Sequence, residues 1–114
     1  MTAGTATAAR PPGTAGASGA PERVRLAERI GAAVAELPEV AGLSAGPRAQ
    51  VVTYRVGPPY AGVAVREGEV EVGVNVARPD RPLPAIAESV RQAALPLAGG
   101  RPVHVLVADI AEGD

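Results

Sequence analysis

The sequence has 114 residues, 46% of them hydrophobic and 20% charged, which fits one small domain with one core. Eleven arginines and no lysine stand against twelve acidic residues, and the net charge of −1 provides no broad positive field for nucleic acid or an anionic membrane. The absence of cysteine excludes a disulfide framework. The sequence contains no uninterrupted run of 18 apolar residues, the length needed to span a bilayer, so direct membrane insertion is not expected.

Residues 1–20 contain only Ala, Gly, Thr, Pro and Ser besides Met1 and Arg10. Without large aliphatic side chains, this stretch cannot bury enough surface to offset the entropy of ordering, so we predict a disordered tail. It also lacks the apolar segment of a signal peptide. We expect a single domain over residues 21–111, followed by a short C-terminal tail over 112–114.

A first helix is predicted from Pro21, which suits the first helical position, to Leu37. Its apolar residues recur at three- and four-residue steps and form one stripe: Val24, Leu26, Ala27, Ile30, Ala33, Val34 and Leu37. Pro38 ends the helix. The next residues, 39–49, contain Gly42 and Gly46 and are predicted to form a loop.

Three strands are predicted next. Residues 50–56 alternate between two faces and form the first strand. Residues 61–77 form a β-hairpin with a two-residue turn at Glu67 and Gly68. The predicted pairs are Val65 with Val70, Val63 with Val72 and Ala61 with Val74, a register that places every valine of the hairpin on one face.

A second helix is predicted from Leu83, and because of Pro96 it either stops at Leu95 or kinks there. The last strand spans residues 103–110, with His104, Leu106 and Ile110 on the face opposite its valines. Because a whole helix lies between this strand and the hairpin, the connection suits a crossover between parallel strands.

These elements predict an α+β fold in the order α-β-β-β-α-β, with two helices packed on the valine face of a mixed four-stranded sheet. No predicted element covers the other face, so this face, or an edge strand, is a candidate surface for self-association. Ordinary exposed aliphatic residues explain the same pattern equally well. The candidate interaction residues are Thr53, Arg55, Arg66, Glu69, Glu71, Asn75, His104 and Leu106.

The sequence shows no constellation that points to catalysis, a metal or a cofactor. There is no cysteine and one histidine, and alternation places His104 and Asp109 on opposite faces of the last strand. Glu67, Glu69 and Glu71 suggest metal ligands or paired acids, but we interpret them as a solvated hairpin face. We therefore predict a protein that is not an enzyme, and the alternative is catalysis by His104 with the hairpin glutamates.

Several segments together resemble one known family. They are PEVAGLSAG after the first helix, TYRVGPPYAGVAVREGEVEVGVNV, PAIAESVRQAALPL and RPVHVLVADI. Their order and patterns resemble the alkaline shock protein family, the envelope stress response proteins of Gram-positive bacteria, and in particular its short members from high-GC genomes. The matching residues are Val40, Gly42, Leu43, the strand 70–76, Val90, Arg91, Gln92, Asp109 and Ile110. The sequence departs from the family at Pro96, at the turn 97–100, and at His104 and Leu106.

The resemblance implies a cytoplasmic, non-enzymatic protein that assembles with itself or with a small membrane-anchored partner. It would reach the membrane only peripherally, through that partner, and would support cell-envelope homeostasis under stress. No catalytic or cofactor-binding residue follows from the resemblance. The alternative is a small-ligand-binding or regulatory domain that uses the loops over residues 57–60 and 78–82.

Overall fold

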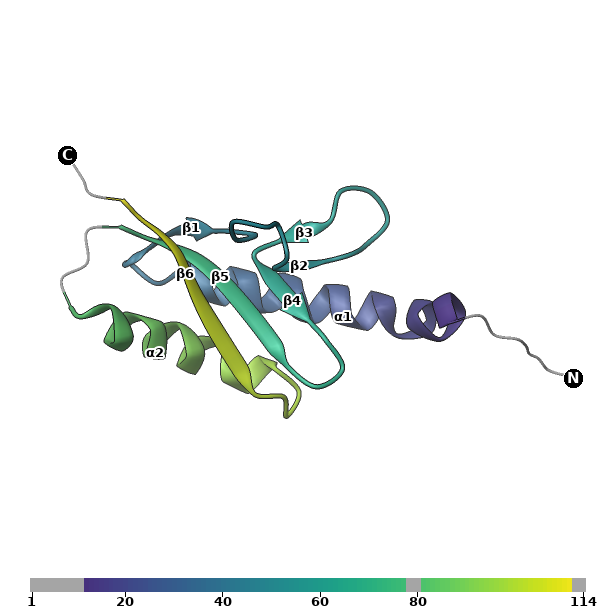
Figure 1. Ribbon diagram of the computed structural model, residues 1–114. Coiled ribbons are helices and arrows are strands. Elements are labelled where there is room, and N and C mark those ends of the chain that lie inside the picture. The colour runs from purple at the N-terminus through teal and green to yellow at the C-terminus, as the bar shows by residue number, and fades with distance from the viewer. Residues whose placement is uncertain (1–11, 78–80, 112–114) are drawn as a thin grey trace, which may run out of the picture.

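A computed structural model describes residues 12–77 and 81–111 and shows the predicted α+β class (Figure 1). The helical elements are α1 (Pro12–Ala35), α2 (Leu83–Ala94) and the short 3-10 helix η1 (Leu95–Leu97). The strands are β1 (Val40–Leu43), β2 (Val52–Thr53), β3 (Tyr60–Ala61), β4 (Val63–Val65), β5 (Val70–Ala77) and β6 (Val103–Ala111).

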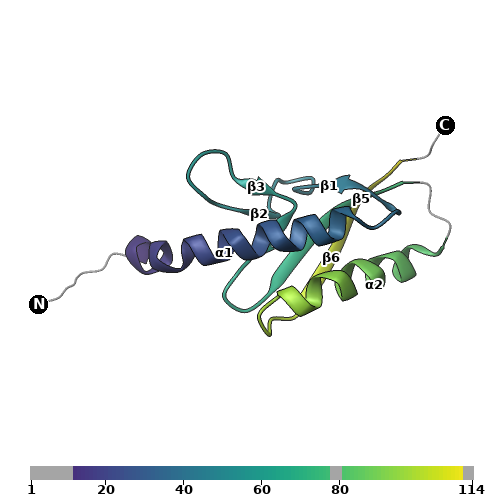
Figure 2. The same cartoon turned by 180° about the vertical axis from the view of Figure 1, so that it is seen from behind.

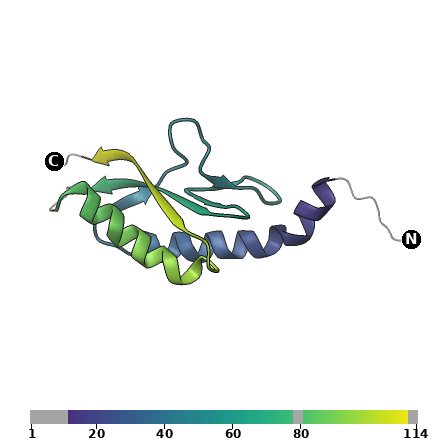
Figure 3. The same ribbon diagram turned by 60° about the horizontal axis from the view of Figure 1, so that its bottom comes forward.

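Both helices pack on the valine face of the main sheet, as predicted (Figures 2 and 3). The apolar stripe of α1 buries Ala27, Ile30 and Val34, and that of α2 buries Ile86, Val90 and Ala94. Opposite them, the four valines of β5 have no exposed surface: Val70, Val72, Val74 and Val76. The core is therefore made of aliphatic side chains placed by helical and strand periodicity.

Strand β5 is the centre of the mixed four-stranded sheet. One edge of β5 pairs antiparallel with β4 along its first half and with β1 along its second half. Its other edge pairs in parallel with β6 along its whole length. The predicted parallel crossover is thereby confirmed, and β6 becomes an outer strand of the sheet (Figure 1).

The hairpin register is confirmed for two of its three predicted pairs, Val65 with Val70 and Val63 with Val72. The third pair is wrong, because Val74 pairs with Leu43 of β1 and Ala61 pairs with Val52. Gly62 separates the two arrangements with a φ of 101°, a conformation that favours glycine. A side chain there would overlap Leu43, so this glycine lets the chain leave the hairpin where β1 enters the sheet.

Two predicted segments thus exchange roles. The predicted loop 39–49 contains β1, and the predicted strand 50–56 is reduced to β2. β2 pairs only with β3, in a separate two-stranded sheet, within the part of the chain that the structure describes. The alternation at 50–56 is real, but Tyr54 and Val56 are exposed rather than buried in the main sheet.

Helix α1 begins at Pro12 rather than at the predicted Pro21, which lies inside it. Because proline has no N–H and its ring crowds the preceding turn, it disturbs the helix, and the first turns of α1 bend away from the rest (Figure 3). Pro96 ends α2 as predicted, since the chain changes to η1 at Leu95. The rest of the predicted N-terminal tail, residues 1–11, and the predicted tail 112–114 lie outside the described residues.

Candidate interaction surface

The reverse face of the sheet, which was expected to be bare, is covered at its centre by the chain itself. The carbonyl oxygen of Ser44 lies so close to Gly73 that a Cβ atom there would overlap it. Val51 is fully buried beside Gly73, and Ala64 is 1% exposed. The segment from Ser44 to β2 therefore covers the centre of the reverse face, and we call this segment the cover. The helix and strand pattern of the sequence did not predict it.

Thr53, one of the candidate interaction residues, is part of this cover and is 6% exposed. Its hydroxyl donates to the carbonyl of Val63 at 2.7 Å and accepts from the N–H of Val65 at 3.0 Å. These two bonds tie β2 to β4 where a buried polar group must be satisfied. Thr53 thus holds the cover in place and offers little surface to a partner.

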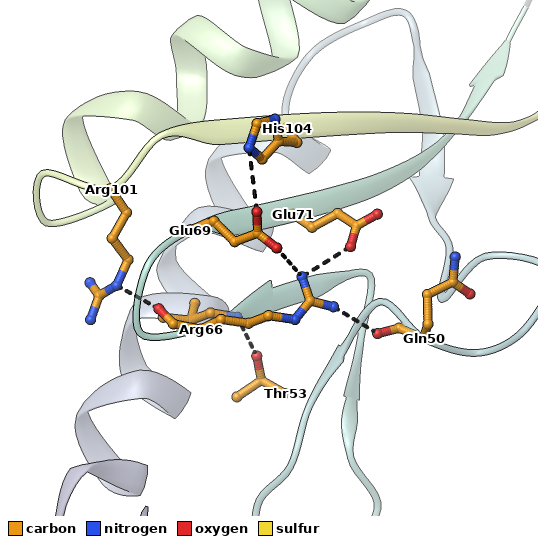
Figure 4. A network of polar contacts seen from close by, with 8 residues as sticks. Gln50, Thr53, Arg66, Glu69, Glu71, Arg101 and His104 are labelled. Atoms are coloured by element: carbon orange, nitrogen blue, oxygen red, sulfur yellow. Dashed lines mark hydrogen bonds and ion pairs between the residues drawn. The ribbon is translucent and has the colours of Figure 1, made fainter.

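Arg66 gathers a polar network beside the cover (Figure 4). Its Nη1 lies 3.2 Å from Glu69 Oε2 and 3.0 Å from Glu71 Oε1, and its Nη2 donates to the Gln50 carbonyl at 3.3 Å. The carbonyl of Arg66 accepts a 2.7 Å bond from Arg101 Nε. Two of the hairpin glutamates, Glu69 and Glu71, are therefore engaged by one guanidinium, which also fastens the cover to the hairpin.

His104 extends this network onto β6, because its Nε2 lies 3.4 Å from Glu69 Oε1 (Figure 4). The histidine side chain is 61% exposed. Within residues 12–77 and 81–111, no group of three or more His, Asp or Glu side chains is arranged to hold a metal ion. The pair is an open surface contact in which Glu69 is shared between His104 and Arg66.

The predicted faces of β6 change at a β-bulge. His104 pairs with Glu71, but the register shifts after Val74, so that Asp109 pairs with Asn75 and Ile110 with Val76. The extra residue is Ala108. His104 and Asp109 therefore share the reverse face, and Ile110 lies on the valine face. The predicted faces of Asp109 and Ile110 were wrong. At about 3.3 Å per residue, His104 and Asp109 remain roughly 13 Å apart along the strand.

Asn75 and Leu106 lie on the reverse face, and both are half-buried. Asn75 stands between Gly42 of β1 and Asp109 of β6. Leu106 reaches towards the cover, where a Cβ atom on Gly46 would lie 3.1 Å from its Cδ2. The two side chains thus mark the margin of the covered area.

Arg55 lies apart from the other candidates, next to α1. Its guanidinium contacts Glu28 at 2.8 Å and lies 5.4 Å from the centre of the Tyr60 ring. Partial burial raises the pKa of Tyr60, with a further contribution from the charge of Glu28. The loop over 57–60 is thereby held against α1 by Tyr60 and Arg55, and the structure does not place Arg55 on the surface formed by His104 and Leu106.

The apolar surface that remains available lies along β6. On the valine face, Val105, Val107 and Ile110 are only half-buried, whereas every valine of neighbouring β5 is fully buried. β6 pairs with β5 alone within the described part of the chain, so its outer edge offers unpaired backbone groups. The predicted crossover indicated a parallel partner for the last strand, but the sequence pattern did not say which strand that partner is, and the structure places it beside β5.

A cavity of about 490 Å³ opens between α1, β2 and the hairpin. Its lining residues are Arg23, Gln50, Val52, Thr53, Tyr54, Val65, Arg66 and Glu67. The loops predicted to bind a ligand do not line it: the loop 57–60 packs on α1, and residues 78–80 lie outside the described residues. Polar and apolar groups both line the cavity, and its Arg66 also belongs to the network with Glu69.

The fold and this surface define a small α+β domain with an open sheet edge and a covered reverse face. Its sequence matches no known family and no curated protein, and its structure matches no solved structure. The resemblance to the alkaline shock protein family therefore stays a prediction. Neither α1 nor α2, as far as they are described, is long and apolar enough to cross a membrane.

Proposed function

We propose that this protein is a non-enzymatic interaction protein that assembles with itself, binds a small membrane-anchored partner, or does both. The observation that supports the proposal is the outer edge of β6, where half-buried aliphatic side chains flank unpaired backbone groups. Exposed edges of this kind are templates for pairing with another chain. Neighbouring charged groups are already engaged with one another, as Glu69 and Glu71 are with Arg66.

The cellular role within this proposal is cell-envelope homeostasis under stress, in the cytoplasm and at the membrane only through a partner. This part rests on the resemblance of the sequence to the alkaline shock protein family. It is compatible with the net charge of −1, which gives the protein little direct attraction to anionic lipid.

Light scattering of the full chain across a wide concentration range tests the self-association, and a mass above that of one chain is expected. Recovery of a specific short membrane protein from detergent-solubilised membranes of the source cells tests the anchor. Its direct binding to the purified chain should then be reproduced with both proteins in isolation. A strict monomer that binds no membrane protein would contradict the proposal.

The cavity beside Arg23 and Tyr54 favours a second candidate function, a small-ligand-binding or regulatory domain. Its volume lies within the range of about 300–1,000 Å³ typical of ligand sites. A thermal-shift screen with small anions and metabolites tests this candidate. A hit that is lost in Arg23→Ala and retained in His104→Ala would support it, and the absence of any stabilising compound would count against it.

A further inference from the structure

The outer edge of β6 carries a pattern that is complementary to itself. The N–H of Val70 on β5 donates to the carbonyl of Pro102 at 2.9 Å, so the backbone groups of Pro102 point towards β5. Backbone groups along a strand point alternately to its two edges. The N–H and C=O groups of Val103, Val105 and Val107 therefore point away from β5, to the open side.

Further along the strand, the edge is closed. The carboxylate of Asp109 accepts a 2.9 Å bond from the N–H of Ile110, just after the bulge residue Ala108. A bulge and a local side-chain cap are both devices that blunt a sheet edge. No such device is found from Val103 to Val107, where the side chains are aliphatic except for His104. The open part of the edge is therefore short, apolar and well defined.

We infer that β6 pairs antiparallel with β6 of a second copy of this chain, about a two-fold axis through Leu106. Counting Ala108 as the extra residue of the bulge, this register places Val105 opposite Val107, and Leu106 opposite itself. It also places His104 opposite Asp109 of the second copy, and Val103 opposite Ile110. The N–H of Ile110 is already bonded to the Asp109 carboxylate, so the backbone pairing is confined to Val105 and Val107. The two residues of each pair then lie on the same face of the sheet. Apolar residues lie opposite apolar residues, and the one histidine lies opposite a carboxylate.

The backbone groups agree with this register. Val105 and Val107 both point their N–H and C=O groups outwards, so as an opposed pair they would exchange two hydrogen bonds, and symmetry repeats the pair. The other symmetric registers are less complementary. An axis at Val105 would oppose His104 and Leu106, and an axis at Val107 would oppose Leu106 and Asp109. The axis at Leu106 alone joins the two polar residues.

The side-chain burial also fits a second copy in this place. Val105, Val107 and Ile110 lie on the valine face, yet they are only half-buried, and no strand of the described chain pairs with the outer edge of β6. A second β6 would extend the sheet across the axis and cover them. This interface is a specific form of the self-association in the proposed function, and the inference rests on that proposed function.

Cysteine cross-linking of the full chain tests the register, because the natural sequence contains no cysteine. Leu106→Cys should form a disulfide-linked dimer under mild oxidation, since opposed residues at a non-hydrogen-bonded position have Cα atoms about 4.5 Å apart, within the range for a disulfide. His104→Cys and Asp109→Cys should each stay unlinked alone and should cross-link when mixed. Glu67→Cys, in the exposed hairpin turn, is the control and should not link.

A second variant tests the edge without cysteine. Val105→Pro removes an N–H that points away from β5, so it leaves the ladder to β5 intact while its ring blocks a second copy. The loss of two symmetric hydrogen bonds should raise the dimer dissociation constant about tenfold or more. Circular dichroism checks that the variant is folded. If Val105→Pro does not fold, the cross-linking of the cysteine variants tests the interface instead.

The outcomes separate this interface from the broader proposal. A dimer by light scattering in which Leu106→Cys does not cross-link, or in which Glu67→Cys links equally well, overturns the β6 interface and leaves self-association standing. A folded Val105→Pro variant that dimerises as tightly as the natural chain also overturns it. A strict monomer overturns both the interface and self-association.

Discussion

The hydroxyl group of Tyr60 lies directly over Gly31 of α1, in the place that a side chain on residue 31 would occupy. Gly31 is buried within the helix, where alanine would ordinarily be preferred by about 1 kcal/mol. The glycine therefore leaves room for the hydroxyl group of Tyr60. Tyr60 anchors the loop 57–60 on α1, and the guanidinium of Arg55 lies over its ring. This contact explains why a helix-weakening residue stands near the C-terminal end of α1.

Gly31→Ala is expected to lower the free energy of unfolding, because the new methyl group overlaps Tyr60, and such overpacking costs about 1–3 kcal/mol. The same substitution in a Tyr60→Ala background should instead raise stability by about 1 kcal/mol, through helix propensity. Urea unfolding of the four proteins measures this reversal of sign. An equal effect of Gly31→Ala in both backgrounds would contradict the role given to the contact.

Thr53→Val should destabilise the domain by about 1–3 kcal/mol, because it leaves the carbonyl of Val63 and the N–H of Val65 without their buried partner. The isosteric change keeps the side-chain volume, so the loss reports the hydroxyl group. Thr53→Ser retains the hydroxyl and should cost distinctly less. The midpoint of urea unfolding, at an unchanged m-value, is the measurement. Equal losses for both variants would point to packing of the methyl group instead.

Gly73→Ala tests the cover over the reverse face of the sheet. The added methyl group would overlap the Ser44 carbonyl, which belongs to the backbone and cannot rotate away, so a loss of about 1–3 kcal/mol or more is expected. Gly42→Ala is the matched control, since no atom lies within 4 Å of the place of its Cβ, and a change within about 0.5 kcal/mol is expected. A neutral Gly73→Ala would mean that the segment 44–51 does not lie on the sheet.

Glu88 should make stability depend on acid pH. Hydrogen bonds from Arg91 and then Gln92 lower the pKa of Glu88 to about 2, from its ordinary value of 4.5. A depressed pKa stabilises the folded state fully above pH 4.5, and this stabilisation is lost as the pH falls towards 2. Glu88→Gln should therefore lower stability at pH 7 and have little effect at pH 2.

Chemical unfolding of Glu88→Gln and of the natural chain at several pH values measures this difference. Arg91→Gln removes the main partner of Glu88 and should reproduce the same pH dependence from the other side of the contact. A stability difference for Glu88→Gln that is the same at pH 7 and pH 2 would show that the ion pair does not act on folding.

The sequence by itself determined the α+β class, the two helices on the valine face and the tight end of the hairpin. These features follow from local periodicity: the stripe of α1, the stripe of α2, and the valine alternation from Val63 to Val76. Pro96 likewise marked the end of α2, because proline acts on the turn in which it lies. The unusual aliphatic content of the core was also readable from composition alone.

Only the tertiary structure decided which segment completes the sheet, what covers its reverse face and where β6 is open. β1, and not the alternating segment 50–56, pairs with the second half of β5. There Gly62, with its positive φ, lies against Leu43, a contact between residues far apart in sequence. The bulge at Ala108 places Asp109 and Ile110 on the faces opposite to those predicted. No local sequence pattern predicts such an extra residue in a strand. Strand pairing is a non-local choice, so the same alternation serves a central strand, an outer strand or a covering segment.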